Sequence, residues 1–366
     1  MRIVVAPDGF TGTLTAVQAA EAVAEGWART APGDELDLVP LSDGGPGFLD
    51  VLQTALGGEL LAARVRGPLG EEVPAAVLLV DGTAYVESAQ ACGLALAPED
   101  RRDPRLTTTY GVGQLLLAAA GAGARRVVVG LGGSGTNDGG AGLLAALGAT
   151  AEGGPLDAGG GALAGVTAVD LAPARERLAG VEVVVASDVD SPLAGPGGAS
   201  MVFGPQKGAT PEVAAELDGV LQRFGRATDE QVARSAGAGA AGGLGHGLLL
   251  LGGTRESGIG AVVDAVGLAE RVAGADLVLT GEGSFDHQSL RGKVVAGVAR
   301  TAAARGTPVV VLAGRVQVGR REYAAIGVES AYGCASTEAE AREAMRRPAE
   351  VLSALAERVA RTWSRA

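Results

Sequence analysis

Four aspartates stand where apolar segments of the sequence end, a place from which a carboxylate can reach a ligand. They are Asp8, Asp43, Asp188 and Asp286. Carboxylates in such places hold Mg²⁺ or take the proton of an attacking hydroxyl group, and phosphoryl transfer needs both tasks. The four positions therefore suggest magnesium-assisted phosphoryl transfer.

The chain contains only two lysines, Lys207 and Lys293, and every other basic residue is arginine. An ammonium group is a compact point charge, whereas a guanidinium group is a wide planar fork. Both lysines fall in or beside glycine-rich segments. Lys293 stands near the expected start of a helix, where a cation opposes the helix macrodipole unless an anion lies between them. We therefore interpret both lysines as phosphate-binding cations.

A glycine-rich segment with hydroxyl, amide and carboxylate groups follows the apolar run at 127–129. Its candidate phosphate-binding residues are Ser134, Thr136, Asn137 and Asp138. Backbone N–H groups at a helix start, together with hydroxyl groups, suit a phosphate. An ordinary capped turn explains the same residue types, so both interpretations stay open at this point. The G-x-G-x-x-G match at 130–135 lacks the acidic residue of a dinucleotide site, and no P-loop motif occurs in the chain.

The elements that position these residues alternate between strand and helix at both ends of the chain. A strand at 3–6 leads to a helix that starts near Thr15, because Thr15 and Gln18 have the spacing of a capping box. The apolar stripe of this helix is expected at Val17, Ala20, Ala24 and Trp27. Further strands are expected at 36–39, 276–280 and 308–313, with a helix at 294–305. This alternation predicts a parallel sheet, whose ligands bind beyond the carboxyl ends of the strands.

The middle of the chain follows a different pattern. Apolar runs at 77–80 and 83–86 flank the pair Asp81-Gly82, which is typical of a two-residue hairpin turn. Hairpins belong to antiparallel or mixed sheets. We therefore expect an α/β protein with two domains. Residues 1–60 and 255–366 form a parallel-sheet domain, and residues 61–254 form an inserted mixed α/β domain.

The composition excludes several classes of function. The formal charge is −12 and the pI is near 4.8, so neither nucleic acid nor an anionic membrane is an expected partner. Cys92 and Cys334 are isolated, which argues against a disulfide framework. His246 and His287 have no partner at metal or catalytic spacing and are interpreted as structural. The sequence offers no signal peptide, and its longest uncharged stretch, 235–254, is too rich in glycine for a membrane helix. We expect a cytoplasmic protein.

An ordered set of short motifs extends over nearly the whole chain. It comprises Ala6-Pro7-Asp8-Gly9-Phe10, Asp43-Gly44-Gly45, 108–111, 130–142, Asp188 with 192–196, 203–209, 242–245 and 281–293. Through these motifs the chain resembles the bacterial glycerate kinase family of the two-domain type. The resemblance implies a flavodoxin-like domain built from both chain ends and an inserted α/β domain. It also implies ATP- and Mg²⁺-dependent phosphorylation of D-glycerate to phosphoglycerate.

The resemblance further implies roles for the residues that match the family motifs. Catalytic roles fall to Asp8, Asp188, Asp286 and Lys293. Nucleotide-binding roles fall to Gly132, Gly133, Ser134, Thr136, Asn137, Asp138 and Lys207. Substrate-binding roles fall to Asp43 and Gln288, and also to Thr11 and Ser284, which occupy motif positions although their residue types differ from the family's. The expected metal ligands are Asp188 and Asp286.

Three motifs depart from the family pattern at positions that suit an anionic acceptor. Thr11 stands where the family usually has lysine, Pro46-Gly47-Phe48 where it has Glu-Gly-Thr, and Ser284 where it has arginine. A carboxylate is normally held by a cation, so two alternatives to glycerate phosphorylation remain. One is a kinase for another small hydroxy acid or polyol, and the other is a nucleotide-binding protein with little turnover. If glycerate is the acceptor, Arg291 and Arg315 are the substitute cations. Which hydroxyl group is phosphorylated, and whether the chain forms a homo-oligomer, stay open.

Overall fold

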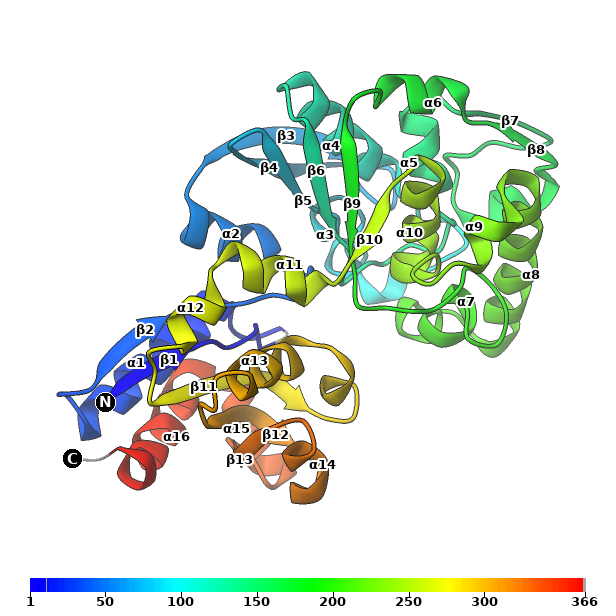
Figure 1. Cartoon of the computed structure of the whole chain (residues 1–366). Coiled ribbons are helices and arrows are strands. Elements are labelled where there is room, and N and C mark those ends of the chain that lie inside the picture. Colours follow the sequence, from blue (N-terminus) through cyan, green and yellow to red (C-terminus); the bar gives the residue numbers. More distant parts are fainter. Residues whose placement is uncertain (11, 365–366) are drawn as a thin grey trace. The chain divides into compact units, whose positions relative to one another are not determined.

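The computed structural model describes residues 1–10 and 12–364, which divide into two compact units (Figure 1). The terminal unit comprises Met1–Asp43, Asp50–Leu56 and Ile259–Ala366. The inserted unit comprises Gly44–Leu49 and Gly57–Gly258. The chain thus changes unit a few residues from 60 and from 254, and the short segment 44–49 belongs to the inserted unit as well.

The terminal unit is built from alternating strands and helices. Its strands are β1 (Arg2–Val5), β2 (Glu35–Leu38), β11 (Leu277–Phe285), β12 (Val309–Val316) and β13 (Val328–Gly333). Its helices are α1 (Ala16–Thr30), α2 (Phe48–Leu56), α11 (Gly258–Ala265), α12 (Leu268–Val272), α13 (Val294–Ala303), α14 (Arg320–Ala324), α15 (Glu338–Arg346) and α16 (Pro348–Trp363). The first residues of α2 and α11 belong to the inserted unit.

The strands of the terminal unit form one parallel sheet in the order β13-β12-β11-β1-β2. Numbered along the chain, this is the order 2-1-3-4-5 of flavodoxin-like folds. Strands β1 and β11 are neighbours, with Val4 opposite Val278. The strand order reverses between them, and the carboxyl ends at such a reversal are where these folds bind ligands. The fold class expected from the sequence is confirmed.

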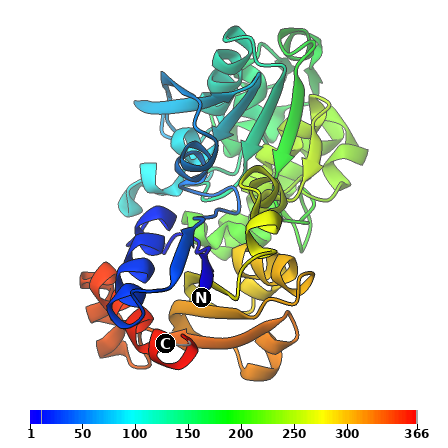
Figure 2. The same ribbon diagram turned by 60° about the vertical axis from the view of Figure 1, so that its left-hand side comes forward.

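Helices cover both faces of this sheet. Crossovers between parallel strands are right-handed as a rule, and β2 and β12 lie on opposite sides of the β1–β11 pair, so α1 and α13 fall on opposite faces. Helix α16 packs beside α1 (Figures 1 and 2), where Gly26 faces the backbone of Ser353. Trp27 and Ile3 are fully buried in the resulting core. No helix among residues 1–10 and 12–364 combines the length and the apolar composition needed to cross a membrane.

Helix α1 begins as the sequence predicted. The N–H of Gln18 donates to Oγ1 of Thr15 (3.1 Å), and the N–H of Thr15 donates to Oε1 of Gln18 (3.0 Å), so the capping box is confirmed. The predicted apolar stripe is partly wrong, because Val17 and Ala24 are only half-buried, whereas Val23 is buried. The helix is covered by α16 as well as by the sheet, and its buried arc is therefore rotated away from the predicted stripe.

The inserted unit contains the remaining elements. Its strands are β3 (Glu59–Arg66), β4 (Glu72–Val80), β5 (Thr83–Glu87), β6 (Arg126–Gly130), β7 (Thr150–Glu152), β8 (Ala168–Asp170), β9 (Glu182–Ala186) and β10 (Thr254–Glu256). Its helices are α3 (Ala89–Cys92), α4 (Tyr110–Gly121), α5 (Ala141–Ala146), α6 (Ala172–Arg177), α7 (Ala199–Phe203), α8 (Pro211–Thr228), α9 (Glu230–Arg234) and α10 (Ala240–Leu250).

The inserted unit has a mixed sheet in the order β10-β9-β6-β5-β4-β3, and β7 pairs with β8 apart from it. Strands β4 and β5 are antiparallel and are joined by Asp81 and Gly82, whose φ angles are 47° and 80°. Positive φ at both residues is what a two-residue hairpin turn requires, so the predicted hairpin is confirmed. Strands β5, β6, β9 and β10 are parallel, which brings the carboxyl ends of β6 and β9 side by side.

Strand β11 is longer than the sequence predicted. A strand at 276–280 followed by a glycine loop was expected, but the strand continues to Phe285 and remains paired with β12. Gly281 permits this pairing, because a Cβ atom there would lie 2.0 Å from the carbonyl oxygen of Leu312. Glu282 therefore belongs to a strand, and its position is fixed by the sheet.

Candidate active site

Asp8 follows β1 and Glu282 lies on the neighbouring β11, at the point where the strand order of the terminal unit reverses. The N–H of Asp8 donates to the carbonyl oxygen of Gly281 (2.8 Å), which continues the pairing of β1 and β11 beyond Val5. Asp43 follows β2, on the other side of β1, and its charge acts on both carboxyl groups. Three carboxylates therefore gather at the carboxyl ends of β1, β2 and β11, where flavodoxin-like folds bind their ligands.

The carboxylates of this acidic cluster repel one another in partly buried surroundings. Burial and the charge of Asp43 raise the pKa of Asp8 well above its ordinary value, and Glu282 acts in the same direction. Burial also raises the pKa of Glu282 to about 7, while Ser289 and Lys293 oppose that rise. Strongly perturbed pKa values at a ligand-binding position are typical of functional sites.

Glu282 is the most deeply buried member of the cluster. Its side chain is only 6% exposed, and its Oε1 atom has no hydrogen-bond partner among the described residues. It is not among the residues predicted from the sequence, because the glycines on both sides of it indicated a loop. The signal that identifies it is the apolar Phe285, which shows that the strand pattern resumes after the glycines.

A turn after β11 carries the remaining residues of this site. Oδ1 of Asp286 accepts hydrogen bonds from the N–H groups of Gln288 (2.7 Å) and Ser289 (3.4 Å). The N–H of Asp286 donates to Oγ of Ser289 (3.1 Å), so the turn is closed from both sides. Lys293 is the N-cap residue of α13, and within the described part of the chain its ammonium group forms no ion pair. Its charge remains available to an anion.

The structure brings several predicted residues of the terminal unit together. Around Glu282 these are Asp8, Asp43, Asp286 and Lys293. Ser284 and Gln288 are exposed on the same segment, and Oγ of Ser284 donates to Oε1 of Gln317 (3.3 Å). Thr11 and the side chain of Arg291 lie outside the part of the chain that the structure describes.

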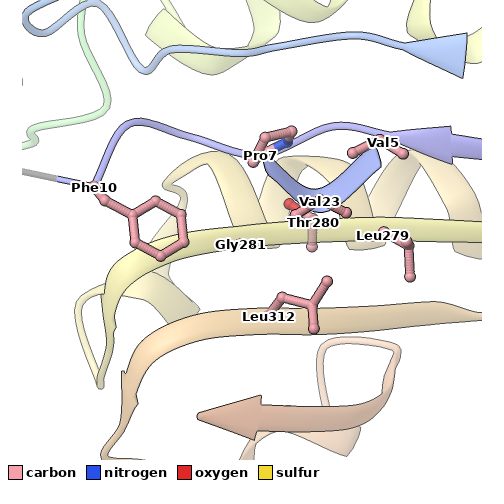
Figure 3. A pocket seen from close by; sticks show the side chains of 8 residues that line it. All are labelled: Val5, Pro7, Phe10, Val23, Leu279, Thr280, Gly281 and Leu312. Atoms are coloured by element: carbon pink, nitrogen blue, oxygen red, sulfur yellow. The ribbon is translucent and has the colours of Figure 1, made fainter. Parts of the chain in front are cut away.

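A small apolar space lies inside the terminal unit (Figure 3). Its lining consists of Val5, Pro7, Phe10, Val23, Leu279, Thr280, Gly281 and Leu312. It has no room for a water molecule, and no charged side chain reaches it. This space belongs to the hydrophobic core that supports the ends of β1 and β11, not to the binding site.

In the inserted unit, the loop between β6 and α5 is enclosed by glycine backbone. A Cβ atom at Gly132 would lie 2.4 Å from Cα of Gly45, and one at Gly242 would lie 1.8 Å from the carbonyl oxygen of Thr136. The N–H of Gly139 donates to the carbonyl oxygen of Gly242 (3.0 Å). The abundance of glycine thus allows backbone segments to pack directly against this polar loop.

The side chain of Lys207 reaches this loop from a segment 73 residues beyond Ser134, and Lys207 is only 2% exposed. Its Nζ atom donates hydrogen bonds to Oγ of Ser134 (2.9 Å) and to the carbonyl oxygen of Thr136 (2.7 Å). Burial lowers the pKa of Lys207 to about 8. The structure therefore brings Lys207 to the predicted nucleotide-binding loop, but it directs the ammonium group toward oxygens of the loop itself. Gly133, by contrast, is exposed.

Asp138 connects the starts of α4 and α5. Its Oδ2 atom accepts hydrogen bonds from the N–H (2.8 Å) and Oγ1 (2.9 Å) of Thr109 and from the N–H of Gly142 (3.1 Å). Its Oδ1 atom accepts one from the N–H of Gly140 (3.1 Å). Burial raises the pKa of Asp138, and these hydrogen bonds counteract the rise. The Asp138 carboxylate thus holds the starts of α4 and α5 together.

Asn137 and His246 close the inner side of the loop. Nδ2 of Asn137 donates to Oγ of Ser200 (2.8 Å), and its Oδ1 atom is buried without a partner among the described residues. Nδ1 of His246 lies 3.0 Å from the carbonyl oxygen of Gly139, and Nε2 lies 3.2 Å from Oγ1 of Thr228. Burial lowers the pKa of His246 to about 4. His246 is therefore a neutral, structural residue at neutral pH.

Asp188 follows β9 and is half-buried. Its Oδ1 atom accepts a hydrogen bond from Oγ of Ser257 (2.7 Å). In the described ranges, no three His, Cys, Asp or Glu side chains are grouped so as to enclose a metal ion. Mg²⁺ is usually held by one or two carboxylates together with phosphate oxygens of the substrate. Carboxylates such as Asp188 and Asp286 therefore suit this ion.

Replacing Lys207 with methionine is expected to flatten the dependence of stability on alkaline pH. The pKa of about 8 in the folded chain lies below the ordinary 10.5, so stability rises as the pH increases from 8 toward 10.5. Above about pH 9 Cys92 opposes this gain, because burial raises the pKa of its thiol to about 12. Urea unfolding between about pH 7.5 and 9 should show the gain in the wild type and not in the variant. An equal gain in both proteins would contradict a buried ammonium group at Lys207.

Comparisons with known proteins cover nearly the whole chain. The family profile described as Glycerate kinase family matches residues 3–364. A glycerate kinase from Halalkalibacterium halodurans is 40% identical over 368 residues, covering 98% of this chain and 97% of that protein. Glycerate 2-kinase from Escherichia coli is 42% identical over 324 residues, covering 86% of this chain and 85% of that protein. A crystal structure from Salmonella typhimurium, described as a glycerate kinase 2, has a TM-score of 0.81 and 37% identity and covers 99% of this chain and 98% of that one.

The matched residues include the acidic cluster of the terminal unit and the glycine loop of the inserted unit. The match also extends to the three-dimensional structure, as the similarity to the Salmonella protein shows. The resemblance drawn from the motifs is thus confirmed, and the chain belongs to the glycerate kinase family.

Proposed function

We propose that this chain catalyses the ATP- and Mg²⁺-dependent phosphorylation of D-glycerate to phosphoglycerate. The observation that carries the proposal is the match to the family over nearly the whole chain. It is supported by the acidic cluster beside Lys293 at the reversal of strand order. Carboxylates and a cation in such a place suit an acceptor hydroxyl group and a phosphoryl group in transfer.

We assign the nucleotide to the glycine loop at 132–138. The exposed Gly133 leaves the backbone accessible to a phosphate group. Lys207 donates its hydrogen bonds to oxygens of the loop, and Asp138 accepts hydrogen bonds from the starts of α4 and α5. We therefore propose that these two residues support phosphate binding indirectly, by fixing the loop.

We propose Asp188 and Asp286 as candidate Mg²⁺ ligands, each on the chemistry of its own surroundings. Both are half-buried carboxylates, and the turn after β11 uses Oδ1 of Asp286 in the hydrogen bonds described above. When bound, Mg²⁺ supplies positive charge that neutralises phosphoryl oxygens. Lys293 contributes further positive charge from the start of α13.

Replacing Lys293 with arginine is expected to lower kcat by about 100-fold. Lys293 sits between the start of α13 and the buried carboxylates of the acidic cluster, where we expect room for a compact ammonium but not for a planar fork. Steady-state kinetics with ATP, Mg²⁺ and D-glycerate measure the effect. The matched control is Arg300→Lys on the exposed side of α13, which should keep the wild-type rate. A rate close to wild type for Lys293→Arg would contradict the need for a compact cation.

The proposed function itself is tested by incubating the purified protein with ATP, Mg²⁺ and D-glycerate. ADP and phosphoglycerate are expected in equal amounts, and phosphorus NMR of the product identifies the phosphorylated hydroxyl group. Binding of ATP without turnover on any acceptor would instead indicate a nucleotide-binding protein.

Ser284 favours a second candidate, a kinase for a less anionic hydroxy acid or polyol. The side chain is exposed and uncharged where relatives were expected to carry arginine.

A cation that could still hold the carboxylate of glycerate lies nearby. Across the strand pair, Ser284 lies opposite Arg315, whose Nη2 atom donates to Oε1 of the exposed Glu338 (2.6 Å). Exposed ion pairs are weak, so Arg315 can exchange this partner for a substrate carboxylate. Comparing kcat/KM for D-glycerate with that for glycerol decides between the two acceptor classes.

A further inference from the structure

The terminal unit buries a carboxylate oxygen for which the described residues supply no hydrogen-bond donor. This atom is Oε1 of Glu282, whose side chain is 6% exposed. Native proteins leave few buried polar atoms without a partner, and such an atom calls for a functional explanation. Glu282 also lies on β11 next to the backbone of Asp8, at the reversal of strand order where this fold binds ligands. A ligand that donates a hydrogen bond would complete the environment of this oxygen.

Two neighbouring carboxylates, those of Asp8 and Asp286, each have one oxygen that accepts hydrogen bonds within the chain. Oδ1 of Asp286 accepts two backbone hydrogen bonds that form the turn before α13. Oδ1 of Asp8 accepts a hydrogen bond from the N–H of Gly9 (2.7 Å). These two oxygens therefore already have hydrogen-bond donors within the chain. Of these three residues, Glu282 is the one with a fully buried oxygen that lacks a donor.

We propose that Glu282 is the general base that takes the proton of the acceptor hydroxyl group, an assignment that rests on the proposed phosphorylation of glycerate. In this step the O–H bond of the acceptor breaks, and the proton passes to Oε1. The electron pair left on the acceptor oxygen forms the new bond to the γ-phosphorus of ATP. The bond between that phosphorus and the β–γ bridging oxygen breaks, and its electron pair leaves with ADP. Glu282 then releases the proton to water.

The charges around Glu282 suit this task. Burial and the charges of Asp286 and Asp43 raise its pKa, Ser289 and Lys293 lower it, and the result is about 7. A general base works best when its pKa is close to the working pH. The groups that face Glu282 from the neighbouring elements are Asp8, Asp43, Asp286, Ser289 and Lys293. The rate is therefore expected to rise with pH through about 7 as Glu282 becomes ionised.

The experiment compares kcat as a function of pH for the wild type, Glu282→Gln, Glu282→Asp and Glu329→Gln at saturating ATP, Mg²⁺ and D-glycerate. The wild-type rate should rise about tenfold per pH unit below the pKa and then level off. Glu282→Gln should lower kcat by at least about 100-fold and lose the rise, with the KM for ATP unchanged. Glu282→Asp should keep the rise at a reduced rate. Glu329 is an exposed residue of β13, and its variant should behave like the wild type.

A second measurement follows the proton directly. The difference spectrum between the wild type and Glu282→Gln should contain a protonated-carboxyl infrared band that titrates near pH 7. The comparison with the variant is needed because the pKa of Asp8 is raised as well. Circular dichroism of the variant shows whether it is folded. If the wild type phosphorylates D-glycerate but Glu282→Gln keeps the wild-type rate or the pH dependence, the assignment of the base is wrong and the proposed function stands. Absence of the titrating band from an active wild type also overturns the assignment. If the wild type does not phosphorylate D-glycerate, the proposed function fails, and the base assignment fails with it.

Discussion

Replacing Glu282 with glutamine is expected to raise the free energy of unfolding by about 3 kcal/mol at pH 8 and to leave it almost unchanged at pH 4. Burial raises the pKa of this carboxyl group from the ordinary 4.5 to about 7. A group of this kind contributes stability that is complete below pH 4.5 and is lost as the pH rises through 7. Glutamine does not ionise, so the variant avoids the loss.

Chemical unfolding of both proteins between about pH 4 and pH 8 measures this difference. His246 titrates in both proteins, so its contribution cancels in the comparison. Asp8 also titrates in both, but its pKa should fall in the variant, because the charge of Glu282 no longer raises it. Glu329→Gln, on the exposed side of β13, should follow the wild type at every pH. A difference between Glu282→Gln and the wild type that does not change with pH would contradict the buried ionisable group. The expected result also means that the chain gives up stability to keep this carboxylate, as enzymes often do at active sites.

Replacing Gly242 with alanine is expected to lower the free energy of unfolding by about 4 kcal/mol. Gly242 has a φ of 70°, a backbone conformation that costs other residues roughly 1–2 kcal/mol. Its Cβ position also lies 1.8 Å from the carbonyl oxygen of Thr136, so α10 or the loop between β6 and α5 must move. Because Lys207 donates to the same carbonyl oxygen, the displacement should also disturb that hydrogen bond.

The control for this prediction is Gly252→Ala. Gly252 has a φ of 86°, and no atom lies within 4 Å of its Cβ position. In this variant the free energy of unfolding should fall only by the cost of the left-handed backbone conformation, roughly 1–2 kcal/mol. Urea unfolding of the two variants therefore separates the backbone conformation from the close approach to Thr136. If the free energy of unfolding fell equally in both variants, the close approach of residue 242 to Thr136 would carry no energetic cost, which would contradict the prediction.

Features that act over a few residues were predictable from the sequence. Thr15 and Gln18 form their capping box within one helical turn, and Asp81-Gly82 closes a hairpin by itself. The parallel sheet of the terminal unit follows from the alternation of strands and helices. Its strand order was not readable from local pattern, because β1 pairs with β11 from the other end of the chain, and the flavodoxin-like expectation came from the family resemblance.

The only residues of the candidate site whose placement could be predicted were those that directly follow a strand. Asp8 and Asp43 were expected at the carboxyl ends of strands of a parallel sheet, and the structure places both there, with the charge of Asp43 acting on Asp8. Their catalytic and binding roles stay predictions. The burial of Lys207 depends on Ser134, 73 residues away, and no local pattern reveals that contact. Glu282 was missed because two flanking glycines look like a loop when the partner strand is unknown.

The pairing of β1 with β11 also determines the order in which the two units can be completed. A ribosome produces β1 and β2 first, then the whole of Gly57–Gly258, and only afterwards β11. Domains fold as units while the chain is synthesised at about 5–20 residues per second. The inserted unit can therefore complete its folding while β1 still lacks its partner strand β11. During that interval β1 exposes an unpaired edge, which invites contact with other chains. A chain that stopped at Gly258 would therefore contain a complete inserted unit, whereas β1 and β2 would lack the other three strands of their sheet.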